Sequence, residues 1–146
     1  MSEQPVGSCV LVLNPKKTHI LLGKRLNSYK AGYYGIPGGR VELGEPLEVC
    51  AQRELYEETQ LTGSTFKFLG TIRENQESYD FIHFVFACTT FTGEVTLAEP
   101  DKCESWKWFS LDNLPRPILP GHKLAINLYE NFLAGKNSYL VDVPKK

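Results

Sequence analysis

Three glutamates and one arginine within six residues are the part of this sequence whose types and spacing could do chemistry. Arg53, Glu54, Glu57 and Glu58 lie in a segment, residues 46–59, whose initial proline and apolar periodicity predict a helix. On a helical wheel, Glu54 and Glu58 fall among the apolar residues that must face the core, and Glu57 lies at the edge of that stripe. Such carboxylates are costly, because desolvation and mutual repulsion both disfavour their charged forms.

A bound cation explains this pattern better than a solvated acidic helix does, because one arginine cannot neutralise three carboxylates. An all-oxygen cluster favours a hard divalent ion, Mg²⁺ or Mn²⁺. The glycines of Pro37-Gly38-Gly39, just upstream, would let the backbone approach and present a carbonyl oxygen, although two glycines taken alone more often form a simple turn. Carboxylate-held Mg²⁺ suits polyphosphate substrates, since the metal neutralises phosphate oxygens and lowers the pKa of an attacking water.

The segment of residues 38–61 resembles the Nudix box, G-x5-E-x7-R-E-U-x-E-E-x-G-U, in which U is aliphatic. The matching positions are Gly39, Glu45, Arg53, Glu54, Leu55, Glu57, Glu58 and Leu61. Gln60 replaces the family's last glycine at the helix exit, where glycine would serve as a C-cap, so this departure concerns the turn rather than the metal site. So many fixed positions make a specific signal.

The resemblance covers roughly residues 7–133, because LLGKR, YYGIPGG and EPDKCESWKWFSLDNLP are similar to MutT-like nucleoside triphosphate pyrophosphatases of the same family. It implies an α/β fold: an α/β/α sandwich with a mixed β-sheet and a loop-helix-loop metal site, in a single domain of residues 1–146. It also implies a Mg²⁺-dependent hydrolase of phosphoric anhydrides, with Mn²⁺ as the alternative ion. Water would attack a phosphorus of a nucleoside triphosphate, or of a related nucleoside diphosphate derivative, and release nucleoside monophosphate and pyrophosphate.

The resemblance also assigns roles by position. The implied catalytic residues are Glu45, Arg53, Glu54, Glu57 and Glu58, and the implied metal ligands are the Gly38 carbonyl, Glu54, Glu57 and Glu58. Arg53 would hold Glu45 or a metal-binding glutamate through a bidentate ion pair. The general base is left open between these glutamates and an acid of a later loop. That acid is Glu99, Asp101 or Glu104, each of which could equally be a solvated charge.

Substrate-binding residues are expected at Lys24 and Arg25, which could contact phosphates, at Phe81, which could stack on a base, and at Glu104. The alternative without a functional role is that Lys24 and Arg25 are solvated at the surface and that Phe81 packs in the core.

Two further aromatic residues, His83 and Trp106, could also stack on a base, although a histidine on an apolar strand is more often simply buried. The stretch of residues 115–119 has no asparagine of the kind with which some MutT proteins read an oxidised guanine. A strict 8-oxo-guanine specificity is therefore not expected.

Two other functions compete with this one. A nucleotide-sugar hydrolase of the GDP-mannose mannosyl hydrolase type shares LLGKR and PGGRV, but those enzymes depart from the standard box, which this chain keeps. A non-catalytic nucleotide sensor on the same fold would usually have lost the glutamates of the box.

Composition sets the remaining expectations. The chain has 146 residues and a net charge of −1, yet its residues 42–58 hold six glutamates and one arginine. That segment carries −5, so the rest of the chain carries +4: a small acidic site in a mildly basic body, with no broad surface for a nucleic acid polymer. Neither a signal peptide nor a membrane helix is visible, so we expect a cytoplasmic protein that binds a small nucleotide. The oligomeric state is left open, with a homodimer allowed by the family resemblance.

The elements that must position the site follow from the pattern of apolar residues. Strands are predicted at residues 7–13, 20–25, 33–36, 65–72, 79–90 and 104–110, and helices at residues 46–59 and 120–133. The first two strands are expected to form a hairpin, and the strand at residues 79–90, apolar on both faces, is expected to be central. The second helix should bury Leu124, Leu128 and Phe132, and Thr59 should lie on the water side of the first.

Overall fold

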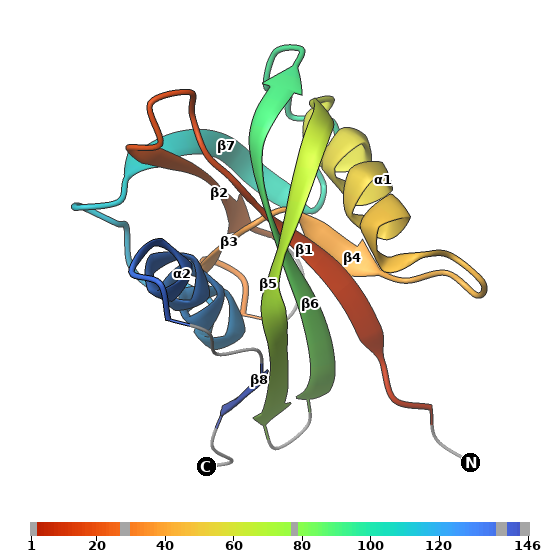
Figure 1. Cartoon of the computed structure of the whole chain (residues 1–146). Helices are drawn as coiled ribbons and strands as arrows, with labels where there is room; N and C mark the ends of the chain where they lie inside the picture. The colour runs from red at the N-terminus through yellow and green to blue at the C-terminus, as the bar shows by residue number, and fades with distance from the viewer. Residues whose placement is uncertain (1–2, 27–29, 77–78, 137–139, 144–146) are drawn as a thin grey trace.

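The computed structural model describes residues 3–26, 30–76, 79–136 and 140–143 (Figure 1). The elements are β1 (Val6–Val12), β2 (His19–Arg25), β3 (Tyr34–Gly35), β4 (Gly38–Arg40), α1 (Leu47–Thr59), β5 (Thr62–Gln76), β6 (Tyr79–Thr92), β7 (Cys103–Ser110), α2 (Pro120–Leu133) and β8 (Leu140–Val143). Both helices and six of the strands therefore lie where periodicity predicts elements, whereas β4 and β8 are additions.

Two sheets organise these strands. The larger sheet has the order β4-β1-β6-β5-β8, and the smaller has the order β3-β2-β7. Strand β6 pairs in parallel with β1 and antiparallel with β5, so the larger sheet is mixed and β6 is its central strand, as predicted.

The predicted hairpin of the first two strands is wrong, because β1 and β2 belong to different sheets and meet only at a bridge between Leu13 and Ile20. Strand β1 is buried on both faces and pairs along its whole length with β6, from Val6–Ile82 to Val12–Cys88. A local turn at Asn14, whose side chain accepts the backbone N–H of Thr18 at 2.8 Å, then redirects the chain into the second sheet.

Gly38 and Gly39, which were expected to let the backbone approach the acidic helix, form strand β4 at the edge of the larger sheet rather than the simple turn that was the alternative. Gly38 and Gly39 pair antiparallel with Cys9 and Ser8 of β1. A side chain at Gly38 would place its Cβ 2.6 Å from the Ser8 carbonyl oxygen, so only glycine allows this approach. Pairing with β1 fixes the backbone that lies directly under α1.

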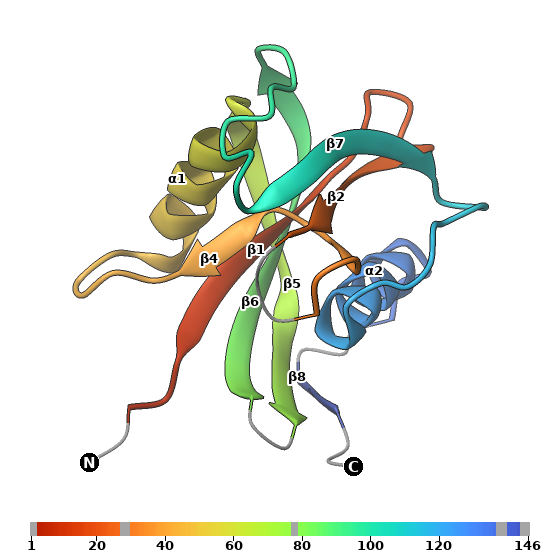
Figure 2. The same ribbon diagram turned by 180° about the vertical axis from the view of Figure 1, so that it is seen from behind.

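The two helices cover opposite faces of the larger sheet, as Figures 1 and 2 show from front and back. Alternate residues of β1 enter two separate cores, Cys9 and Leu11 on the α2 side and Val10 and Val12 on the α1 side. This arrangement is the expected α/β/α sandwich.

Two details of the helix faces differ from the predictions. Thr59 is fully buried instead of facing water, because its hydroxyl donates to the Leu55 carbonyl at 2.7 Å and accepts the Leu61 N–H at 3.2 Å. Leu128 is buried and Leu124 packs against the core, as predicted, whereas Phe132, in the last turn of α2, is 43% exposed.

Three small features complete the fold. The C-cap of α1 is Gln60, in the left-handed conformation with φ 62°, and its N–H donates to the Tyr56 carbonyl at 2.8 Å. Cys9, Cys50, Cys88 and Cys103 are buried free thiols. Among the described residues, no helix is both long and apolar enough to cross a bilayer.

Replacing Leu55 by alanine should lower the free energy of unfolding by about 2–5 kcal/mol, because the side chain is fully buried between α1 and the sheet. Chemical denaturation would measure the loss. Tyr56→Ala, one residue along the same helix and 55% exposed, is the matched control and should change stability by about 0.5 kcal/mol or less. Equal losses in the two variants would contradict the assigned orientation of α1.

Candidate functional site

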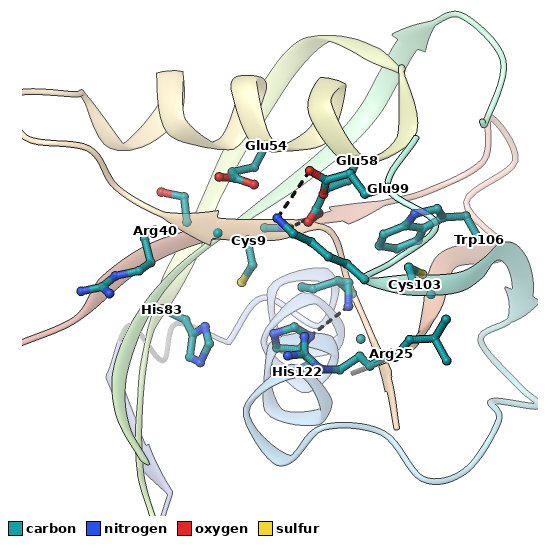
Figure 3. A pocket seen from close by; sticks show the side chains of 18 of the residues that line it. Cys9, Arg25, Arg40, Glu54, Glu58, His83, Glu99, Cys103, Trp106 and His122 are labelled. Carbon is teal, nitrogen blue, oxygen red and sulfur yellow. Dashed lines mark hydrogen bonds and ion pairs between the residues drawn. The ribbon is translucent and has the colours of Figure 1, made fainter. Parts of the chain in front are cut away.

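A cavity of about 670 Å³ opens between α1, the edge of β4 and the start of α2 (Figure 3). Glu54, Glu58 and Glu99 lie along one side of it, and His83, His122 and Arg25 lie along the other. The cavity therefore has an acidic end and an end lined by imidazole and guanidinium groups.

Glu54 and Glu58 are the two box glutamates that line the cavity. They point from α1 toward β4, and the side chain of Glu54 is only 14% exposed. Burial raises the pKa of Glu58 to about 8, although the Gly38 N–H, which donates to Glu58 Oε1 at 2.9 Å, acts in the opposite direction. Burial also raises the pKa of Glu54, against the influence of Arg53. Both carboxylates are therefore short of positive charge.

The backbone of β4 lies directly beneath these carboxylates. A Cβ on Gly39 would lie 2.5 Å from Glu54 Oε1, so glycine is required for Glu54 to sit there. The Gly38 N–H points away from β1 toward Glu58, and the carbonyl of a strand residue points to the same side as its N–H. The Gly38 carbonyl thus faces the outer edge of β4, on the side of Glu58.

Arg53 links several backbone and side-chain groups around the outside of the cavity. Its guanidinium donates to both oxygens of Glu45 at 2.7 and 3.0 Å, in a bidentate pair. It also donates to Glu54 at 2.9 Å, to Glu57 at 3.1 Å and to the Arg40 carbonyl at 3.0 Å. The hydrogen bonds from Arg53 lower the pKa of Glu45 to about 2. Arg53 therefore ties the loop before α1 to the face of α1 that carries the glutamates.

Glu57 is placed differently from the other two box glutamates. Its side chain is 48% exposed, contacts Arg53 and does not line the cavity. Across the described part of the chain, no three acidic, histidine or cysteine side chains are gathered closely enough to hold a metal ion by themselves. The pair that the fold itself brings together is Glu54 and Glu58.

The loop before β7 contributes two of the three acids that the sequence left open. Glu99 and Asp101 line the cavity, whereas Glu104 lies outside it and pairs with Lys24 at 3.6 Å. Both members of that outer pair are substantially exposed, so neither contacts the cavity. Lys102 also lines the cavity, and its pKa is raised chiefly by Glu99, whose Oε2 lies 3.5 Å away.

Arg25 and Phe81, two of the expected substrate-binding residues, line the cavity, and Trp106 lines it as well. The Phe81 ring stacks on Tyr79 with centroids 5.9 Å apart and lies 4.7 Å from the His83 ring. Phe81 and Trp106 therefore present aromatic surface to the cavity rather than only to the core.

Lys102 and His122 are among the cavity residues that were not predicted from the sequence. Lys102 carries no local signal, because a lysine beside Asp101 in a polar loop is ordinary. His122 could have been found by the reasoning applied to Glu54, since it is a polar residue on the buried, otherwise apolar stripe of α2.

Comparisons with known proteins agree with this geometry. The model of the NUDIX domain family matches residues 3–132. The chain is 33% identical to the NAD-capped RNA hydrolase NudC of Vibrio vulnificus (strain CMCP6) over 135 residues, which are 89% of this chain and 48% of that protein. It is also 33% identical to a putative 8-oxo-dGTP diphosphatase of Bacillus subtilis (strain 168) over 125 residues, 86% of this chain and 79% of that protein.

Among solved structures, a MutT Nudix hydrolase from Burkholderia pseudomallei superimposes with a TM-score of 0.81 and 29% identity, covering 87% of this chain and 98% of that one. The chain spans about half the length of the NudC relatives it matches. The family match over most of the chain, the shared fold and the glutamate-bearing helix over a glycine strand lead to one conclusion: this chain belongs to the Nudix hydrolase family.

Proposed function

We propose that this protein is a Mg²⁺-dependent pyrophosphohydrolase that cleaves a nucleoside triphosphate into a nucleoside monophosphate and pyrophosphate. The observation that carries the proposal is the pair of desolvated carboxylates, Glu54 and Glu58, facing a cavity large enough for a nucleotide. Two partly buried acids with raised pKa values and little compensating charge form a site that a divalent cation would stabilise.

The residues present fit a magnesium ion. Mg²⁺ commonly keeps several waters and takes only one or two protein carboxylates together with substrate phosphates, so Glu54 and Glu58 suffice as the protein core of such a site. The Gly38 carbonyl and Glu57, once turned from Arg53, are the proposed additional ligands. When bound, Mg²⁺ would neutralise phosphate oxygens and make water a better nucleophile.

The chain's own groups supply orientation and charge. Arg53 holds Glu54 through one hydrogen bond and Glu45 through two, which restricts how the metal-side carboxylate can turn. Arg25, Arg40 and Lys102 are basic residues that line the cavity, and they are the proposed contacts for phosphate oxygens. Glu99, which also lines the cavity, is the proposed acceptor of the proton from the attacking water, with a box glutamate as the alternative.

The names of relatives support a triphosphate substrate. The Bacillus subtilis relative is a putative 8-oxo-dGTP diphosphatase, and a Danio rerio relative, 34% identical over 113 residues, is an oxidized purine nucleoside triphosphate hydrolase. The NudC relatives are hydrolases of NAD-capped RNA, so an NAD-type dinucleotide is the second candidate substrate.

A substrate panel with product analysis tests this function. With Mg²⁺ present, nucleoside triphosphates should yield monophosphate and pyrophosphate, measured by ion-exchange chromatography. GDP-mannose and NAD⁺ in the same panel separate the alternatives, because they would release GDP with free sugar and two mononucleotides, respectively. A folded protein that turns over none of these substrates with Mg²⁺ or Mn²⁺ would refute the proposal.

Glu58→Gln should lower kcat by roughly 100-fold or more, because it removes a charge placed to act on the reacting phosphate through the metal, while leaving the shape of the side chain intact. Turnover and Mn²⁺ binding measured together would show whether both are lost. Glu48→Gln, on the exposed side of the same helix, is the matched control and should keep both. Near-normal Mn²⁺ affinity in Glu58→Gln would remove that residue from the metal site.

Arg53→Lys should lower kcat by roughly 10–100-fold although the charge is kept, because lysine cannot make the bidentate pair with Glu45 and hold Glu54 simultaneously. Steady-state kinetics would measure the effect, with Arg116→Lys at an exposed position as the control. If Arg53→Lys retained the full kcat, the charge of Arg53 would matter and its geometry would not.

A further inference from the structure

His122 is a buried histidine at the end of the cavity opposite the glutamates. It lies in the first turn of α2, is 8% exposed, and its ring lines the cavity beside Arg25 (Figure 3). His122 has no role in the proposed metal site, because the acidic residues lie across the cavity from it. The question is therefore what an imidazole does there.

One ring nitrogen of His122 has a fixed role. The Ile36 backbone N–H donates to Nδ1 at 2.9 Å, so Nδ1 carries no proton. Burial, with His83 and Arg25 nearby, lowers the pKa of His122 well below its usual range, so the ring is neutral. A neutral ring with an unprotonated Nδ1 carries its proton on Nε2, which makes Nε2–H a donor.

The Nε2–H group is open to the cavity. Nε2 has no hydrogen-bond partner among the described residues. Among those residues, Glu74 Oε2 is the only fully buried side-chain oxygen or nitrogen without a partner, so Nε2 is accessible from the cavity. The hydrogen bond from the Ile36 N–H orients the ring, and the Gly35 backbone packs close to it, since a Cβ at Gly35 would lie only 2.8 Å from Nδ1. A bound ligand that covers this donor without offering it an acceptor would leave it unpaired, which costs free energy. The donor therefore favours ligands that place an acceptor beside it.

The surroundings show that polar groups are maintained at this end despite burial. Glu74 is 2% exposed, and its Oε1 lies 3.2 Å from His83 Nε2, while the His83 and His122 rings meet edge to face with centroids 5.4 Å apart. Phe81 and Trp106 line the same cavity and offer aromatic faces for a base. A polyphosphate held at Glu54 and Glu58 would direct its base toward this end.

We propose that His122 is a specificity-determining residue whose Nε2–H donates to a keto oxygen of the substrate base, favouring 6-oxo purines over purines that carry hydrogen at C6. This inference rests on the proposed function for the direction in which the nucleotide lies. It concerns a different residue and a different part of the ligand from the metal site.

Binding of two monophosphates that differ at one atom tests the inference. Inosine 5′-monophosphate carries the O6 acceptor and purine riboside 5′-monophosphate lacks it, and titration calorimetry in Mg²⁺ buffer would measure both. The wild-type protein should bind the inosine ligand about tenfold more tightly, and His122→Phe should bind the two equally. Phe81→Leu is the control, because losing a stacking surface should weaken both ligands alike and keep the tenfold ratio.

Three results would overturn the inference: equal affinities in the wild-type protein, no binding of either ligand, or an unchanged ratio in a folded His122→Phe. If thermal melting shows that His122→Phe is unfolded, His122→Leu serves as the second variant. Equal affinities of the wild-type protein for the two ligands would overturn the inference without any variant. Because these ligands are not hydrolysed, a wild-type preference without any triphosphate turnover would reject only the proposed function. Triphosphate turnover with equal affinities would reject only the role of His122.

Discussion

The partial burial of two carboxylates, Glu54 and Glu58, on the sheet-facing side of α1 is the constraint on which the rest of the structure depends. An α-helix that faces a sheet normally buries apolar side chains, and the cost of burying acids must be offset by neighbours. Here the offset on the protein side is small: one backbone N–H for Glu58 and one guanidinium contact for Glu54. Positive charge is what the protein does not provide here, and the proposed divalent cation would supply it.

Much of the surrounding fold serves to bring backbone and charge close to these two acids. Strand β4 can lie under α1 only because Gly38 and Gly39 lack side chains, and its pairing with β1 makes that short segment rigid. Arg53 then connects Glu54 to Glu45, the residue that precedes the helix by two positions. The central sheet holds the acidic end and the histidine end of the cavity at opposite sides of a single pocket.

Local sequence patterns were sufficient to predict the two helices, most of the strands and the identity of the acidic pair, because helical periodicity alone places Glu54 and Glu58 on the buried face. These patterns were insufficient where contacts between residues far apart in the sequence determine strand pairing or burial. Strand β1 pairs with β6 rather than with β2, and the paired residues, such as Val6 and Ile82, are more than seventy residues apart in the sequence. No local turn signal encodes such a pairing. The burial of Thr59 depends on its own hydroxyl contacts, and the selection of Glu99 over Glu104 for the cavity depends on how a loop folds back.

A crystal structure of the protein soaked with Mn²⁺, with the ion located by its anomalous scattering, is the most direct test of the central idea. If the buried acids form the metal site, a peak should lie within coordinating distance of the Glu54 and Glu58 carboxylates, at the outer edge of β4. A peak elsewhere, or none at saturating Mn²⁺ with both carboxylates well ordered, would contradict the view that this fold buries its glutamates to hold a divalent cation.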